Sequence, residues 1–304
     1  MGITRIRILG APFNGLESAK GRENPAEGLR AAGLTARLAE RIKDVGDLGD
    51  IGGIEFVERM DPATGLLDFV PWRRLIATVR DRISTELVDC AFVLVLGGDC
   101  ALVPGVVAGA STEGARRTGL VYLDGHADYH TIETSPTGDP ADLVLAALTG
   151  RAGIDLQAIA PGFPIIDDSD VAVIGFRSHE QIETPRIPVW DAPTFRRLGY
   201  RETAQQVANA LIACDRLWIH LDVDVFDPSL VPVLYPEPGG LDDHDVTGFL
   251  HQLARSSRIA GMDVCCYHPD LDPTGRASAL ITQVVVEFIS QLSKGEAHGL
   301  GRSE

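Results

Sequence analysis

Three short segments of the sequence place acidic residues beside histidine or cysteine. They are residues 97–100 (Gly-Gly-Asp-Cys), residues 124–128 (Asp-Gly-His-Ala-Asp) and residues 220–228 (His-Leu-Asp-Val-Asp-Val-Phe-Asp-Pro). Each follows an apolar run that is typical of a buried strand. Acidic side chains gathered in a protein interior are stable only when they are paired or hold a cation. The three segments therefore point to a metal site.

Spacing within the second and third segments lets their side chains converge. Residues two positions apart in an extended chain point the same way, so Asp222 can align with Asp224, and Asp124 and His126 with Asp128. Carboxylate oxygens together with imidazole suit Mn²⁺, and also Fe²⁺, Co²⁺, Ni²⁺ or Zn²⁺. We expect one or two such ions. With two ions, a hydroxide held between them is a strong nucleophile at neutral pH.

Other residues of the three segments are expected to have structural roles. A single Asp-Xaa-Asp pair more often forms a turn or a helix cap than a metal site, so the prediction depends on the segments occurring together. Asp99 is expected to form a turn or to lie beside the ligands, and Asp227, which precedes a proline, to brace its loop. Gly97 and Gly98 permit a tight exit from a strand, and His220 is expected to be structural.

The segments lie in a regular alternation of elements. Short runs rich in Val, Ile and Leu alternate with stretches of helical periodicity. The runs lack the polar alternation of half-exposed strands, as expected for parallel strands buried on both faces. This order predicts a three-layer α/β/α domain with an open, mostly parallel sheet, in which ligands bind beyond the carboxyl ends of the strands. The predicted strands are 6–9, 92–96, 120–123, 171–174, 217–221 and 259–264; the predicted helices are 26–41, 72–88, 203–213, 243–254 and 277–292; loops are expected at 109–119 and 134–140.

Composition narrows the class of protein. With 304 residues, 45% hydrophobic content and no low-complexity linker, the chain is expected to form one domain over residues 1–304. A net charge of −16 argues against nonspecific nucleic-acid binding, which needs a positive surface. No apolar run approaches the roughly 18 residues of a membrane span, and the N-terminus does not resemble a signal peptide. Five scattered cysteines, an odd number, fit a reducing cytoplasm.

The three segments, in their order and spacing, resemble the motifs of the ureohydrolase family, which includes arginase, agmatinase and formimidoylglutamase. The family motifs are Gly-Gly-Asp-His-Ser, Asp-Ala-His-Xaa-Asp and Ser-Xaa-Asp-Xaa-Asp-Xaa-Xaa-Asp-Pro. Residues 24–34 also resemble the family's early helix start, and residues 236–241 resemble the loop after the last acidic motif. The resemblance covers roughly residues 6–290.

This resemblance implies a sheet of about eight mostly parallel strands flanked by helices, in a homo-oligomer that is a trimer or a hexamer. It implies two Mn²⁺ ions that share Asp124 and Asp222. Asp128 would also orient the bridging hydroxide, which would attack the carbon of an amidine or guanidine in a small-molecule substrate. The residues that would complete the two metal sites are His126 with Asp224, and Asp128 with Cys100.

Cys100 departs from the family, because a metal-binding histidine stands at this position in the motif. A thiolate binds metal but prefers softer ions than Mn²⁺. Three interpretations stay open: Cys100 binds a different or more weakly held metal, it lies beside a single firmly held ion, or it is a small buried residue in an inactive site. Cysteine here also resembles the branch of N-hydroxyarginine hydrolases, which implies that activity survives the change.

Cys266 is a second departure. It falls where the family has a glutamate that pairs with the guanidinium of the substrate. A neutral thiol cannot replace that carboxylate, and losing such a contact costs about 2–5 kcal/mol of binding. Either the substrate is less cationic or another acid holds it, with Glu133, Asp139 and Glu237 as candidates. Three roles stay open for Cys266 itself. It could form part of the wall that contacts the substrate, act as a nucleophile or redox switch, or be an inert core residue.

The loop after Asp128 is a third departure. The amino-acid-binding asparagine of arginases falls on His130 here, and their proton-relay histidine falls near Ala141. Arginine itself is therefore not the expected substrate. His130 becomes a candidate for substrate contact or proton transfer. Arg177 and His179 follow a predicted strand and are expected near the rim of the pocket.

Two classes of function follow from these observations. The first is a metal-dependent hydrolase that uses a metal-bound hydroxide to cleave a C–N bond of a guanidino, hydroxyguanidino or amidino compound. The alternative is a noncatalytic relative with a degraded metal site, which serves as a binding or assembly subunit. The retained Asp and His residues favour the first class, whereas the changes at Cys100, Ala141 and Cys266 motivate the second.

Overall fold

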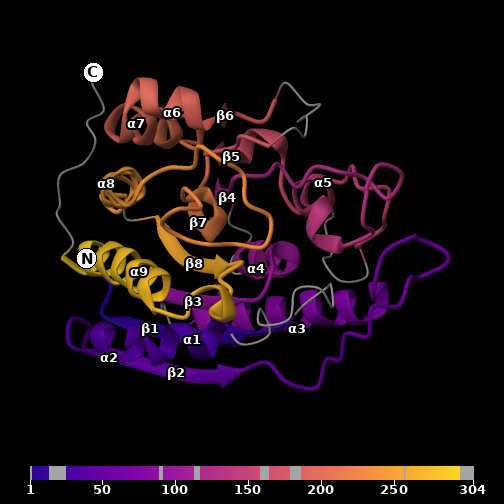
Figure 1. Cartoon of the computed structure of the whole chain (residues 1–304), viewed down its shortest axis with the longest axis horizontal. Helices are drawn as coiled ribbons and strands as arrows, with labels where there is room; N and C mark the ends of the chain where they lie inside the picture. The colour runs from indigo at the N-terminus through magenta and orange to yellow at the C-terminus, as the bar shows by residue number, and fades with distance from the viewer. Residues whose placement is uncertain are drawn as a thin grey trace.

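Eight parallel strands form one sheet, in the order β2-β1-β3-β8-β7-β4-β5-β6 (Figure 1). The computed structural model describes residues 2–13, 25–88, 92–112, 117–157, 164–178, 186–256 and 258–294. The expected α/β architecture with a parallel sheet is confirmed. The strands are β1 (Arg5–Ala11), β2 (Asp44–Asp50), β3 (Phe92–Gly97), β4 (Thr118–Leu123), β5 (Val171–Ile174), β6 (Val189–Trp190), β7 (Arg216–Asp222) and β8 (Ile259–Cys265).

The central strands are buried along their whole length, which explains their unbroken apolar sequences. Every residue of β3, β4 and β7 is buried. The two outermost strands were not predicted. Strand β2 reads Asp-Val-Gly-Asp-Leu-Gly-Asp and has no fully buried residue, so it carries no hydrophobic signal. Ion pairs support it from neighbouring elements, among them Arg7 with Asp44 and Arg30 with Asp47.

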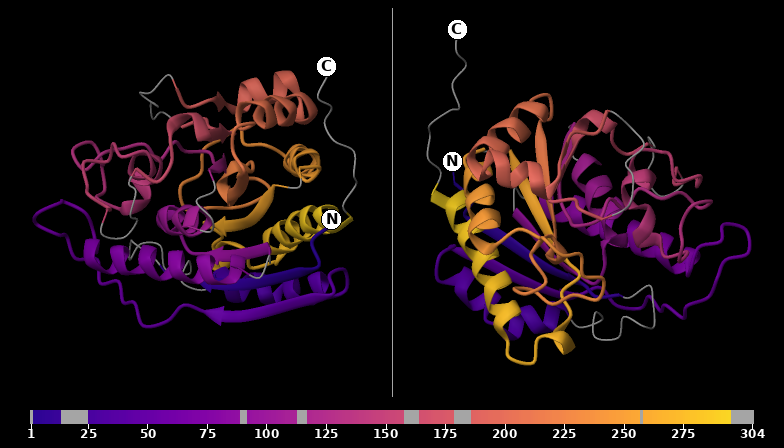
Figure 2. Two further views of the ribbon diagram at one scale, coloured as in Figure 1. Left: turned by 180° about the vertical axis from the view of Figure 1, so that it is seen from behind. Right: turned by 45° about the horizontal axis from the view of Figure 1, so that its top comes forward.

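Helices cover both faces of the sheet, as the two views in Figure 2 show. One face packs against α1, α2 and α6 to α9, and the other packs against α3, α4 and α5. The main helices are α1 (Pro25–Ala31), α2 (Leu34–Ala39), α3 (Phe69–Val88), α4 (Val103–Thr112), α5 (Val144–Leu148), α6 (Ala192–Leu198), α7 (Tyr200–Ala210), α8 (Asp243–Leu253) and α9 (Arg276–Lys294).

Two helix predictions were wrong in instructive ways. The helix expected over 26–41 is divided into α1 and α2, because Gly33 between them has a φ of 88°. Helix α4 was not predicted, and part of it occupies the expected loop 109–119. It lacks a polar face because residues 103–110 are all buried. A Cβ at Gly105 would lie 2.8 Å from Ile76 O, so this glycine permits α4 to lie close against α3.

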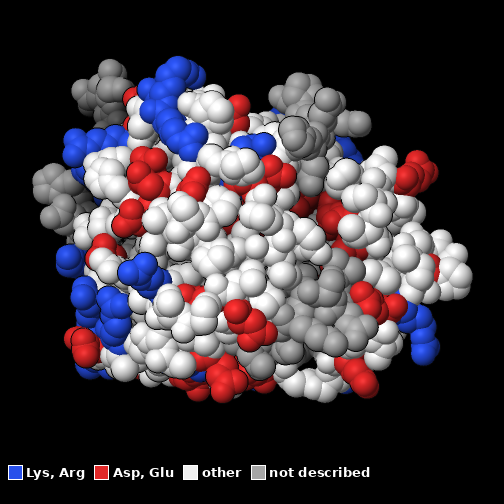
Figure 3. Space-filling view, viewed as in Figure 1, with Lys and Arg blue, Asp and Glu red and all other residues white. Residues whose placement is uncertain are grey.

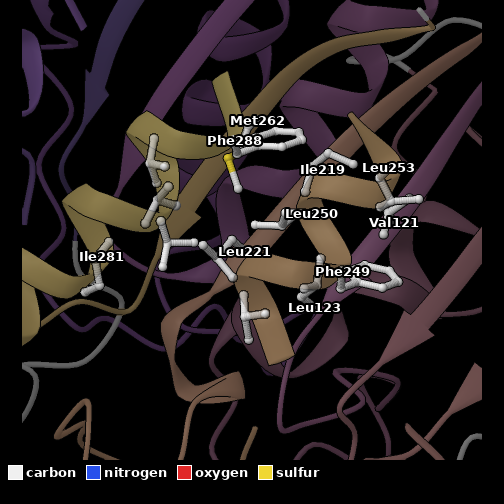
Figure 4. Packing of buried hydrophobic residues seen from close by; sticks show 14 of the residues in the cluster. Val121, Leu123, Ile219, Leu221, Phe249, Leu250, Leu253, Met262, Ile281 and Phe288 are labelled. Carbon is white, nitrogen blue, oxygen red and sulfur yellow. The ribbon is translucent and has the colours of Figure 1, made fainter. Parts of the chain in front are cut away.

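The larger core holds the central strands in register against α8 and α9. Figure 4 shows side chains of β4 and β7 packed against both helices, with Met262 of β8 beside them. The acidic segments lie at the carboxyl ends of these strands, so the packing of the core fixes the position of the site. The labelled residues are Val121, Leu123, Ile219, Leu221, Phe249, Leu250, Leu253, Met262, Ile281 and Phe288.

Charged side chains are scattered over the face seen in Figure 3, with acidic and basic groups interspersed among uncharged areas. Among the described residues, no helix combines the length and apolar character needed to cross a membrane.

Candidate metal and substrate site

The site lies beyond the carboxyl ends of four adjacent central strands, β3, β8, β7 and β4. Cys100 follows β3, Asp124 follows β4, Asp222 ends β7 and Cys266 follows β8. Because all four strands run in parallel, their ends meet at one edge of the sheet. Residues that are far apart in the sequence are thereby brought into contact.

A cavity of about 650 Å³ opens at this edge. Its walls include residues of the acidic segments, residues 233–237 and part of the loop 130–142. Cavities of this volume accommodate small molecules. The cavity therefore joins the candidate metal ligands to space for a substrate.

Among the described residues there are three groups of candidate ligands, two of which share Asp124, while the other joins His220 to Asp263 and Cys265. Residues of the two groups that share Asp124 line the cavity. In the first, donor atoms of Cys100, Asp124, His220 and Asp222 lie within 4.8 Å of one another. In the second, those of Asp124, His126 and Asp224 do so. Carboxylate oxygens with an imidazole are suitable donors for a divalent metal, so these residues fit the ion that the sequence predicted. The binding of metal by these residues stays a prediction.

One oxygen of each carboxylate is fixed by a backbone amide. The amide of His126 donates to Asp124 Oδ1 over 2.6 Å, and that of Asp224 donates to Asp222 Oδ1 over 2.8 Å. The amide of Gly125 donates to Asp224 Oδ1 over 2.8 Å, and His126 Nδ1 lies 2.7 Å from Asp224 Oδ2. With Oδ1 fixed in this way, the second oxygens of Asp124 and Asp222 lie near Cys100 Sγ.

Electrostatics at the centre favour a bound cation. Burial, together with Asp224 and Asp124, raises the pKa of Asp222 well above its usual range, and burial with Asp124 raises the pKa of Asp224. Burial also acts to raise the pKa of Asp124, but hydrogen bonds from His126 and His220 outweigh it and lower that pKa. Three buried carboxylates therefore compete for too little positive charge, which a divalent ion would supply.

Asp128 is held by a buried tyrosine. Tyr122 in β4 donates its hydroxyl to Asp128 Oδ2 over 2.5 Å, and its ring is fully buried. The backbone of Asp128 has a φ of 47°, an uncommon conformation for a residue other than glycine. Asp128 lines the cavity. The arrangement fixes one oxygen of Asp128 and directs the carboxylate at the site.

We expect Tyr122→Phe to lower turnover about 10- to 100-fold, because a partner of this kind orients the groups that act directly. Steady-state rates and a thermal melt would be measured together, so that misfolding is recognised. Tyr129→Phe is the matched control: Tyr129 is also buried but contacts Thr149 Oγ1 and does not line the cavity. Equal rates for Tyr122→Phe and the wild type would contradict this role for Tyr122.

Gly98 lets the chain turn toward the site at Cys100. A Cβ at Gly98 would lie 1.8 Å from Phe13 O, so only glycine fits against this backbone. Asp99 then accepts a hydrogen bond from Ala101 N over 3.0 Å and begins a short 3-10 helix at Cys100. The expected turn-forming role of Asp99 agrees with this contact, and the glycine is needed for close approach.

Replacing Gly98 with alanine is expected to destabilise the protein by about 1–3 kcal/mol, because either β3 or the segment at Phe13 must move. Denaturant unfolding would measure the loss. Gly52→Ala is the control, since a Cβ at Gly52 would meet nothing within 4 Å. If both variants unfold at the same denaturant concentration, the close approach at Gly98 does not contribute to the free energy of unfolding.

Cys266 lies beside Cys100 at the cavity wall. Their Sγ atoms are 3.7 Å apart, and the amide of Cys266 donates to Gly98 O over 2.7 Å. Cys266 has a φ of 64° and is half-buried. Burial raises the pKa of the Cys100 thiol well above its usual range, so in the absence of a metal that thiol is neutral.

The structure separates the candidate substrate-binding residues. His130, Asp139 and Glu237 line the cavity. Glu133 is exposed and is not among the lining residues, so its placement argues against the predicted contact with substrate. Asp139 also accepts a hydrogen bond from Ala141 N over 3.0 Å, which stabilises the turn that follows.

Arg177 braces the loops that carry the site. Its guanidinium donates to Asp224 O over 2.5 Å and to Glu237 O over 2.9 Å. His179 lies outside the described residues. Asp227 accepts hydrogen bonds from Ser229 and so stabilises its own loop, in agreement with the structural role expected for it.

The sequence predicts a structural role for His220, but this residue lies in the first group of candidate ligands. The available signal was its position two residues before Asp222, on the same face of a buried strand.

Known proteins share the sequence pattern and the fold of this chain. The Arginase family model matches residues 4–290. The chain is similar to an arginase of Brucella melitensis biotype 1, with 27% identity over 298 residues that cover 94% of this chain and 96% of the relative. It is also similar to the solved structure of an arginase from Bacillus caldovelox, with a TM-score of 0.86, 27% identity and coverage of 97% of this chain and 100% of that one. The chain therefore belongs to the arginase family.

Proposed function

We propose that the protein is a metal-dependent hydrolase that cleaves a C–N bond in a guanidino, hydroxyguanidino or amidino small molecule. The observation that carries the proposal is the convergence of Asp124, Asp222 and Asp224 with His126 at a cavity of about 650 Å³. Membership of the arginase family supports it, as do the relatives named arginase.

The residues present suit two divalent ions that share Asp124. Oxygen donors with one imidazole make Mn²⁺ the ion we propose for the group of Asp124, His126 and Asp224. When bound, such ions lower the pKa of a water molecule and polarise the substrate. The thiol of Cys100 makes a softer ion suitable for the other group.

We assign the positioning of the attacking water to Asp128, because Tyr122 fixes one oxygen of this carboxylate and the residue lines the cavity. We assign proton delivery to the leaving amine to His130. An imidazole can donate and accept protons, and His130 lies on the cavity wall with Nδ1 3.3 Å from Thr134 Oγ1.

The cavity wall favours a substrate that is less cationic than a guanidinium. At Cys266 the neutral thiol cannot form the paired hydrogen bonds that a carboxylate makes with such a cation. A hydroxyl group on nitrogen withdraws electrons and makes a guanidino group less basic. We therefore propose hydroxyguanidino compounds as the preferred class, with Asp139 or Glu237 contacting the remote end of the molecule.

The test compares three compound classes at equal concentration. Metal-loaded protein is incubated with hydroxyguanidino, guanidino and amidino compounds, and release of the hydroxyurea, urea or amide product is followed. We expect the hydroxyguanidino compounds to react fastest. Cys266→Glu supplies a carboxylate at this wall and should shift the preference toward guanidino compounds by about 10-fold or more.

Absence of turnover in all three classes, in both the wild type and the double variant Cys100→His with Cys266→Glu, would contradict a hydrolase. Turnover with an unchanged preference in Cys266→Glu would leave the hydrolase standing and contradict the inference about substrate charge.

A further inference from the structure

His220 is placed as a metal ligand would be. It lies in β7 two residues before Asp222 and is fully buried. Its Nε2 atom is 3.5 Å from Cys100 Sγ and 3.8 Å from Asp124 Oδ2. The imidazole therefore presents one nitrogen to a buried thiol and a buried carboxylate, both of which are candidate ligands.

Contacts on its other side fix the ring in this orientation. Nδ1 lies 2.5 Å from Asp263 Oδ2, and Tyr122 stacks on the ring with centroids 4.3 Å apart. Asp263 is itself held by Trp218, whose Nε1 donates to Asp263 Oδ1 over 2.6 Å. A carboxylate that accepts a hydrogen bond from one nitrogen fixes the ring and directs the other nitrogen at the ligand group, which is the usual setting of a metal-binding histidine.

The separation between the sulfur of Cys100 and Nε2 of His220 matches the size of a metal ion. Bonds of about 2.3 Å to sulfur and about 2.0 Å to nitrogen, at a tetrahedral angle, separate the two atoms by roughly 3.5 Å. The distance between Cys100 Sγ and His220 Nε2 is 3.5 Å, and Asp124 Oδ2 lies 3.9 Å from the same sulfur. Asp222 Oδ2 lies closer to that sulfur, at 2.7 Å, as the acceptor of a thiol hydrogen bond that a metal would replace.

The two departures from the family motifs are complementary. Cys100 stands where the motif has histidine, and His220 stands where the third motif begins with serine. An imidazole is thus lost from the end of β3 and gained on β7, within contact distance of the position that lost it.

We propose that His220, together with Cys100, Asp124 and Asp222, binds a divalent ion, with His220 supplying the imidazole that Cys100 does not. This inference rests on the proposed function, because it requires the protein to bind metal. Binding would displace the thiol proton of Cys100 and the proton on Nε2 of His220, so that both atoms present a lone pair to the ion. One sulfur and one nitrogen among the donors select Zn²⁺, Co²⁺ or Fe²⁺ over Mn²⁺ at this position.

Cobalt provides a readout that does not depend on activity. Metal-free protein is titrated with Co²⁺ under reducing conditions, and the bound metal and the sulfur-to-cobalt absorption band in the near ultraviolet are measured. We expect two equivalents and a sulfur band in the wild type. His220→Asn should weaken binding at the sulfur-bearing site at least about 10-fold. His126→Asn, the matched control, should lose the other ion and keep the band.

The outcomes separate this inference from the proposed function. If His220→Asn binds Co²⁺ with the wild-type affinity, stoichiometry and band, His220 is a structural residue and the hydrolase proposal stands. If the wild type binds no Co²⁺, or binds it without a sulfur band, the proposed ligand set is wrong. In the first of these two cases the metal-dependent hydrolase is contradicted as well.

A second measurement needs no substitution at the buried His220. The His126→Asn protein, loaded with one equivalent of Co²⁺, is studied by X-ray absorption spectroscopy. The proposal requires sulfur and imidazole scattering from the same ion, because His126 can no longer provide the nitrogen. Sulfur without imidazole would overturn it. The double variant Cys100→His with His220→Ser should bind two ions and lack the sulfur band.

Discussion

Asp222→Asn is expected to remove turnover, by roughly 10³-fold or more, while the metal-free variant melts no lower than the metal-free wild type. The substitution keeps the shape of the side chain and an oxygen that can accept the hydrogen bond from Asp224 N. It removes the negative charge that Asp222 supplies to the ligand group of Cys100, Asp124 and His220. Stability is expected to be retained because burial and the neighbouring carboxylates make the ionised form of Asp222 unfavourable and raise its pKa.

Rates with a saturating metal supply, metal content and thermal melts would be measured on one preparation. Asp243→Ala is the control, because Asp243 is an exposed acid in the first turn of α8 and does not line the cavity. Full activity of Asp222→Asn would contradict a mechanism based on metal. A large drop in the melting temperature of the metal-free variant would instead mean that Asp222 is needed for folding.

Asp263→Ala is expected to have the largest effect on stability, a loss of about 3–5 kcal/mol. Asp263 has no exposed surface and accepts hydrogen bonds from Trp218 Nε1 over 2.6 Å and from His220 Nδ1 over 2.5 Å. Its removal leaves the indole, the imidazole and the thiol of Cys265, which donates to Asp263 Oδ2 over 3.4 Å, without this partner in the interior of the sheet. Equilibrium unfolding in denaturant, with metal removed from all samples, would measure the change.

Asp270→Ala is the control for this experiment. Asp270 is an exposed acid a few residues after β8, so its loss should change the free energy of unfolding by no more than about 0.5 kcal/mol. If Asp263→Ala is as stable as Asp270→Ala, the buried pair of Asp263 and His220 contributes little to the free energy of unfolding. The orientation of the imidazole must then come from packing against Tyr122.

Much of the fold could be predicted from the sequence because the central strands are buried on both faces. Their continuous apolar runs gave β3, β4, β5, β7 and β8 to within a few residues. Strand β2 could not be predicted, since it is an edge strand of the sheet and is held by ion pairs such as that between Arg7 and Asp44. Helix α4 was missed because a helix buried on every side has no polar face to produce a periodic pattern.

The spacing within each acidic segment also determined which residues could act together. Alternate side chains of one extended segment share a face, which grouped Asp124 with His126 as the structure does. The same spacing grouped Asp222 with Asp224, but Asp224 lies in a short 3-10 helix (Val223–Val225) and belongs to the other ligand group. The placement of Cys100 near Asp222 agrees with the order of the three segments after parallel strands.

Only the tertiary structure decided the partners of His220 and the position of Glu133. The sheet order puts β7 between β8 and β4, which brings Asp263 to one side of His220 and Tyr122 against its ring. No local pattern encodes which strands are neighbours, because pairing is decided by packing across the whole sheet. Likewise the path of the loop 130–142 decides that Glu133 is exposed to solvent whereas Asp139 lines the cavity. Both are acidic residues, so their side-chain chemistry does not distinguish them.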